Sequence, residues 1–113
     1  MPANEDLVRR LRSLLDGEAA VTEKRMFGGL AFLLDGKMAV AASGQGGLLV
    51  RVDPAEGAAL VAETSARPME MRGRSMTGWL YLEAADVARD EDLAPWVERG
   101  LSGARAAIGD APG

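Results

Sequence analysis

Residues 24–40 read KRMFGGLAFLLDGKMAV and carry more structural information than any other part of the chain. Asp35-Gly36 is a strong signal for a two-residue hairpin turn, because both residue types tolerate the positive φ that such a turn needs. We therefore expect a long strand over residues 24–34, a tight turn, and a second strand over 37–42. The pair Gly28-Gly29 interrupts the first strand and predicts a bulge or the close approach of another backbone.

Apolar residues occupy both faces of the expected strand 24–34, whereas a sheet covered on one side normally alternates apolar and polar residues. One face would carry Met26, Leu30, Phe32 and Leu34, and the other Phe27, Ala31 and Leu33. Either the strand is covered on both faces, by a short helix at 54–64 or a strongly curled sheet, or one face meets another chain. The second alternative predicts a homodimer, since monomers rarely expose so large an apolar patch.

Hydrophobic periodicity and capping residues place the remaining elements. We expect helices at 4–16, at 54–64 and from Asp90 onward, and strands at 48–52, 69–72 and 77–82. This order predicts a two-layer α+β domain with a five-stranded, mostly antiparallel sheet, covered chiefly by the first and last helices. Gly100 and Gly103 weaken the last helix, which close packing would explain. The single domain spans residues 1–113, with its core at about 5–106 and a frayed tail at 107–113.

The composition argues against several classes of function. The chain has 113 residues, a formal net charge of −4, no histidine and no cysteine. An acidic balance opposes general binding to phosphate backbones, so we expect no direct nucleic-acid binding. Without histidine and cysteine the commonest general base, thiolate nucleophile and metal ligands are missing, so we expect no catalytic residue, metal or cofactor. No membrane-length apolar run and no signal peptide are evident, which favours a cytoplasmic protein.

Three arginines are candidates for binding an anion. Arg25 precedes the glycine pair, and Arg72 and Arg74 flank Gly73 in a short connection. Guanidinium groups beside open backbone amides bind carboxylates or phosphates. The alternative is that these arginines pair with surface acids of the acidic chain.

Aromatic and methionine side chains offer a second kind of site. Trp79 and Tyr81 alternate on a strand, as in a base-stacking platform, but with so few flanking lysines we favour packing in a core or an interface. Five methionines on the expected strands form either a soft peptide groove or ordinary core filling; they are Met26, Met38, Met69, Met71 and Met76. The candidate ligand or partner contacts are Arg25, Phe27, Gly28, Gly29, Arg72, Arg74 and Trp79.

Several motifs in order resemble one known family. They are Arg25-Met26-Phe27-Gly28-Gly29, Asp35-Gly36, the strand at 48–52, Met69-Glu70-Met71-Arg72, Gly78-Trp79-Leu80-Tyr81-Leu82 and the closing Leu93…Trp96-Val97. Together, over about residues 5–106, they resemble the TfoX N-terminal domain family. The resemblance implies a two-layer fold in the order α-β-β-β-α-β-β-α, similar to secretion-chaperone-like domains.

The resemblance also implies a class of function. Full-length TfoX (Sxy) proteins regulate bacterial natural competence together with the cyclic-AMP receptor protein, and they carry a second, C-terminal helical domain. This sequence has no such segment before Gly113, so we expect a stand-alone, non-enzymatic interaction or regulatory module. It would act on transcription or competence through a protein partner. The alternative is a small anionic-ligand-binding protein that uses Arg25, Arg72 and Arg74.

Overall fold

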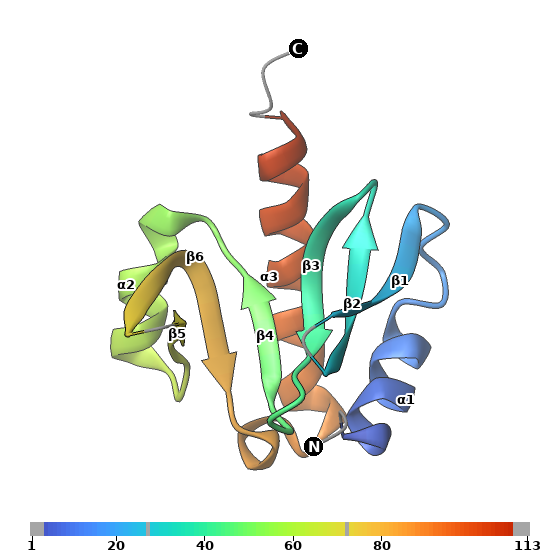
Figure 1. Ribbon diagram of the computed structural model, residues 1–113, viewed down its shortest axis with the longest axis horizontal. Coiled ribbons are helices and arrows are strands. Elements are labelled where there is room, and N and C mark those ends of the chain that lie inside the picture. The colour runs from blue at the N-terminus through green and yellow to red at the C-terminus, as the bar shows by residue number, and fades with distance from the viewer. Residues whose placement is uncertain (1–3, 27, 72, 110–113) are drawn as a thin grey trace.

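In the part of the chain that the structure describes, a six-stranded sheet forms one layer and three α-helices form the other (Figure 1). The computed structural model describes residues 4–26, 28–71 and 73–109. Its elements are α1 (Glu5–Leu14), β1 (Val21–Met26), β2 (Gly29–Leu34), β3 (Lys37–Ala42), β4 (Leu48–Arg51), α2 (Pro54–Glu63), β5 (Arg67–Met71), β6 (Arg74–Leu82), the 3-10 helix η1 (Ala84–Val87) and α3 (Asp90–Gly109). None of the described helices is long and apolar enough to cross a membrane.

The strands lie in the order β1-β2-β3-β4-β6-β5, and every neighbouring pair is antiparallel. The first four strands follow one another as a meander. Helix α2 and strand β5 are then inserted between β4 and its neighbour β6. The α+β class is confirmed, and the expected count of five strands is corrected to six.

The sixth strand arises because residues 24–34 do not form one strand. The backbone reverses between Met26 and Gly29, and Gly28 has a φ of 79° in the connection. Phe27 lies outside the described residues. The glycine pair therefore marks a turn between β1 and β2 rather than a bulge, because glycine supplies the positive φ that the reversal needs. The expected close approach is confirmed at Gly29, where a Cβ atom would overlap the carbonyl oxygen of Ala42.

The second hairpin follows the prediction. Asp35 and Gly36 form the turn between β2 and β3, with φ values of 48° and 83°. A bulge follows in β3, because Phe32 pairs with Val40 whereas Leu33 pairs with Met38. Val40 consequently points into the core, and Met38 lies on the opposite face of the sheet.

The hydrophobic core lies between the helices and one face of the sheet. Its largest fully buried side chains are Phe32, Leu7, Leu11, Leu48, Leu82, Leu93, Val40, Val50 and Val87. Helix α3 crosses β3 and β4 at close range, since a Cβ atom on Gly100 would lie 2.6 Å from the Ala39 carbonyl oxygen. Helix α1 packs beside α3, while Leu60 and Val61 of α2 pack against the core near β6. The last helix is the main covering, as expected; α1 adds buried leucines beside it, and α2 shares the covering over β6.

Candidate interaction surface

The second face of the sheet is covered by none of the described helices: their core residues pack against the other face, and α3 lies behind β3 and β4 in Figure 1. We call this surface the open face. The alternation and register of the strands place two or three residues of each strand on the open face. They are Thr22, Lys24 and Met26 of β1, Ala31 and Leu33 of β2, Met38 and Ala41 of β3, Leu49 and Arg51 of β4, Arg67 and Met69 of β5, and Trp79 and Tyr81 of β6.

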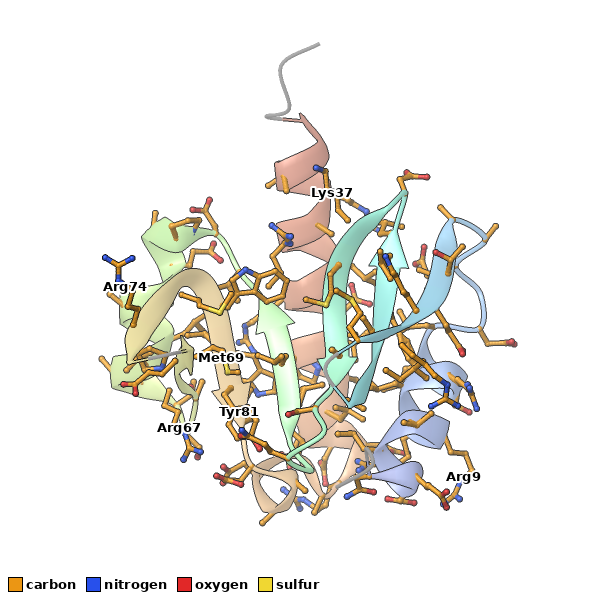
Figure 2. All side chains as sticks on the ribbon, viewed as in Figure 1. Arg9, Lys37, Arg67, Met69, Arg74 and Tyr81 are labelled. Carbon is orange, nitrogen blue, oxygen red and sulfur yellow. The ribbon has the colours of Figure 1, made fainter. Side chains whose placement is uncertain are left out.

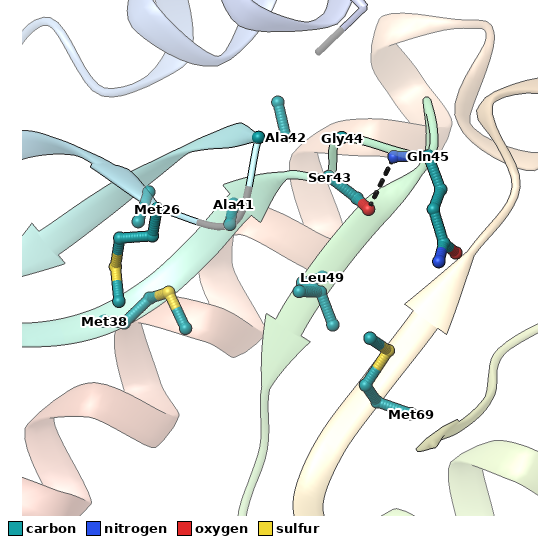
Figure 3. A pocket seen from close by; sticks show the side chains of 11 residues that line it. Met26, Met38, Ala41, Ala42, Ser43, Gly44, Gln45, Leu49 and Met69 are labelled. Carbon is teal, nitrogen blue, oxygen red and sulfur yellow. Dashed lines mark hydrogen bonds between the residues drawn. The ribbon is translucent and has the colours of Figure 1, made fainter. Parts of the chain in front are cut away.

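A hollow of about 340 Å³ lies in the middle of the open face (Figure 3). Met26 and Met38 line one side, Met69 approaches from the other side, and Leu49 lies between them. The hollow exists because small residues occupy the centre of the sheet and long residues surround them. Ala31 and Ala41 are paired partners on β2 and β3, so no side chain larger than a methyl group fills this part of the face.

The described methionines do not fill the core. Met26, Met38, Met69 and Met76 are half-buried, and of the methionine side chains that the structure describes none belongs to the buried core. The explanation by core filling is therefore wrong for these four, and the side chain of Met71 lies outside the described ones. Three of them, Met26, Met38 and Met69, meet at the hollow. Thioether side chains are flexible and polarisable, so such a surface adapts to differently shaped apolar groups.

A second hollow, of about 290 Å³, adjoins the first towards β5. Its lining includes Gln45 and Met69, which also line the first hollow. Arg67, Glu70 and Tyr81 complete its polar part, and Figure 2 shows Met69 and Tyr81 in this region of the face. The two hollows form one groove across the open face, which we call the methionine groove.

Two arginine–aromatic pairs lie on the open face: Arg67 and Tyr81 line the second hollow, and Arg51 and Trp79 lie beside the first one, next to Met38. The guanidinium carbon of Arg51 lies 4.5 Å from the centre of the Trp79 ring, and that of Arg67 lies 4.9 Å from the centre of the Tyr81 ring. Each pair joins directly opposed residues of adjacent strands. The aromatic pair predicted from sequence is on one face as expected, but guanidinium groups cover its rings.

Arg51 is held in place by a second contact. Its Nε donates a hydrogen bond of 2.7 Å to the carbonyl oxygen of Met38. Burial lowers the pKa of Arg51, because a half-buried charge is less well solvated than an exposed one. The guanidinium nevertheless stays charged at neutral pH, so the open face holds an oriented, partly desolvated cation.

Tyr81 is the most deeply buried aromatic residue of the open face, with 4% of its surface exposed. Burial raises the pKa of its hydroxyl, and the charge of Glu83 raises it further. A backbone hydrogen bond with Gly47 and the charge of Arg67 act in the opposite direction. The hydroxyl lies against Gly47, where a side chain would collide with it.

The predicted arginine cluster is not assembled among the described residues. Arg25 pairs with Leu30, so it lies on the helical side of β1, whereas Arg74 begins β6. Strands β1 and β6 are separated by three strands. Neither arginine lines the methionine groove, and Figure 2 shows Arg74 at the outer edge of the molecule, away from Met69. Arg72 lies outside the described residues.

The other predicted contacts lie on or beside the open face. Trp79 stacks under Arg51, and Gly28 lines the first hollow. Gly29 packs against the backbone after β3 and has a structural role there. Phe27, as noted above, is not described.

The sequence prediction missed Arg51 and Arg67 as parts of the surface. Arg51 follows Leu49 at strand spacing, which places both on the same face of β4, and this signal was available. The sequence did not indicate which aromatic residue lies opposite Arg51, because β4 pairs with β6 across the intervening α2 and β5.

Comparison with known proteins agrees with the fold and the motifs. The family model of the TfoX N-terminal domain matches residues 13–104, which is most of the chain. No curated protein matches the sequence. The chain belongs to the TfoX N-terminal domain family.

Proposed function

We propose that this TfoX-like chain is a non-enzymatic interaction module that binds a protein partner through its open face. The observation that carries the proposal is the methionine groove on the side of the sheet that no described helix covers. Apolar surface with adaptable methionines, beside aromatic and arginine side chains, is the composition typical of the centres of protein interfaces.

The chemistry of the groove supports binding rather than catalysis. Among the described residues that line its first hollow, none carries a titratable side chain. The Ser43 hydroxyl accepts a hydrogen bond of 3.1 Å from the Gln45 backbone and has no histidine to activate it, since the chain contains none.

Family membership supports a regulatory role for the complex. We infer that the partner is a cytoplasmic protein and that the complex acts on transcription or competence, without direct contact between this chain and DNA. A homodimer through the same face stays a prediction. It requires Ala31 and Leu33 to lie on the open face, and both do.

The test is affinity capture from the native host with three forms of the tagged chain. Met69→Glu places a charge in the groove, and Leu14→Glu places one on α1, where Leu14 is already 38% exposed. Proteins captured by the wild type should be retained by Leu14→Glu and lost from Met69→Glu, with both variants melting like the wild type. Equal capture by folded Met69→Glu would show that partners bind elsewhere.

A further inference from the structure

Charge is distributed unequally between the two layers of the molecule. The described strands carry six basic residues, Lys24, Arg25, Lys37, Arg51, Arg67 and Arg74, against two acidic ones, Glu23 and Glu70. The three α-helices carry eight acidic and five basic residues. The net acidity of the chain therefore comes from the helical layer and the loops, and the sheet is basic.

The basic residues of the open face differ in their partners. Arg67 forms an ion pair of 2.7 Å with Glu83. Within the described part of the chain, Lys24 and Arg51 have no acidic partner within ion-pair distance. Glu23, the acidic residue that precedes Lys24, lies on the helical side of β1 and pairs with Arg12.

Arg51 is the best placed of these cations to select a ligand. It lies two residues from Leu49 on the same strand face, beside the Met38 end of the methionine groove. Stacking on Trp79 and the hydrogen bond from Nε fix the plane of its guanidinium group. A fixed guanidinium can offer its two terminal nitrogens to both oxygens of one carboxylate.

We propose that the open face binds a peptide segment that combines apolar side chains with Asp or Glu, and that Arg51 binds one of its carboxylates. This inference rests on the proposed function and names the chemistry of the partner. Apolar side chains of the segment enter the methionine groove, and the acidic residue reaches Arg51 beside Trp79. Charge complementarity favours such a segment over a second copy, because a symmetric pair would bring two sets of Lys24, Arg51 and Arg67 into one interface.

The experiment measures fluorescence anisotropy of labelled peptides of about ten residues. Leucine or methionine occupies alternate positions, and the intervening positions carry either glutamate, glutamine or lysine. Each peptide is titrated with the wild type, with Arg51→Met, which keeps the length of the side chain without its charge, and with Arg9→Met. Arg9 is an exposed arginine of α1 and serves as the matched control.

We expect the glutamate peptide to bind the wild type roughly tenfold more tightly than the glutamine peptide. Arg51→Met should remove this preference while leaving the affinity for the glutamine peptide within about twofold. Arg9→Met should behave like the wild type, and Met69→Glu should weaken the binding of the glutamate and glutamine peptides.

Each contrary result has a distinct meaning. Equal binding of the glutamate and glutamine peptides, or a preference that survives Arg51→Met, overturns the role of Arg51 and leaves the proposed function standing. If Met69→Glu binds the glutamate and glutamine peptides as tightly as the wild type does, or if the wild type binds no peptide, both the inference and the proposed function are overturned. A single-stranded oligonucleotide that binds the wild type and displaces the glutamate peptide would assign the face to nucleic acid and overturn the inference.

Discussion

At the scale of single residues, Gly29 stands where β2 passes closest to the backbone that follows β3. A Cβ atom there would overlap the Ala42 carbonyl oxygen and lie 3.0 Å from the Gly44 nitrogen. We expect Gly29→Ala to lower the free energy of unfolding by about 1–3 kcal/mol, because backbone must shift to admit the methyl group. Chemical denaturation measures the change.

A second glycine provides the control for this prediction. Gly57 lies in α2, and the atom nearest to a Cβ added there is Val52 Cγ2 at 3.9 Å, which is an ordinary contact. Gly57→Ala should therefore stabilise the fold by about 0.5–1 kcal/mol through helix propensity. An unchanged midpoint for Gly29→Ala would show that the close approach is not rigid.

Tyr81 gives a residue-scale prediction that depends on pH. It is the single tyrosine of the chain, so its ionisation can be followed by ultraviolet absorbance without overlap from another phenol. Its pKa should lie above the ordinary value of 10.0, chiefly because of burial. Arg67→Met should raise this pKa further and Glu83→Gln should lower it, since Arg67 favours the phenolate and Glu83 opposes it.

The direction of this shift fixes its effect on stability. Since the pKa is higher in the folded state, the neutral phenol contributes its full stabilisation below about pH 10, where both states are protonated. That contribution is lost as the pH rises through the pKa of the folded state. A titration midpoint at or below the ordinary value would contradict the burial of Tyr81 against Gly47.

At the scale of elements, α3 depends on two glycines for its position over the sheet. Cβ atoms on Gly100 and Gly103 would each lie 2.6 Å from a carbonyl oxygen, of Ala39 and of Arg51 respectively. Gly100→Ala and Gly103→Ala should each destabilise the fold by about 1–3 kcal/mol, although alanine is the better helix former by about 1 kcal/mol.

An exposed position in the same helix separates packing from propensity. Ser102→Ala should leave the stability unchanged or raise it slightly, because Ser102 is exposed. Thermal melts of the three variants give the comparison. Stabilisation by Gly100→Ala would mean that the helix can move away from β3 without cost.

Elements with strong end signals could be predicted from the sequence. Asp53 caps α2 by accepting a hydrogen bond from the Ala55 amide, and Pro54 opens the helix, as its φ allows. The turn at Asp35-Gly36 has the conformation that these residues favour. Strand β1 was partly missed because most of its residues are exposed, so it lacks an apolar face. A glycine pair also carries the same signal for a bulge as for a reversal of the chain.

At the scale of the whole molecule, the open face could be predicted only in part. The two apolar faces of residues 24–34 indicated that some apolar surface is left over after the helices are packed. The sequence could not indicate that Met26 and Met69, from strands at opposite ends of the sheet order, line one hollow. That arrangement depends on strand order and sheet curvature, which no local pattern encodes.

The basic open face predicts how salt changes each mode of association. Binding of the glutamate peptide should weaken as sodium chloride rises from about 20 mM to about 500 mM, because screening reduces attraction to Arg51 and Lys24. Self-association through the same face should strengthen, because screening reduces repulsion between copies. Anisotropy and sedimentation velocity measure the two effects. A peptide affinity that does not change with salt would contradict the role of charge.

The most direct measurement uses the methionines themselves as probes of the open face. Protein labelled with 13C in the methionine methyl groups gives one signal for each of its six methionines, and single Met→Leu variants assign them. On addition of the glutamate peptide, the signals of Met26, Met38 and Met69 should shift together and saturate at one affinity. Peptide binding detected by anisotropy that leaves these three signals unmoved would contradict the assignment of the open face as the binding surface.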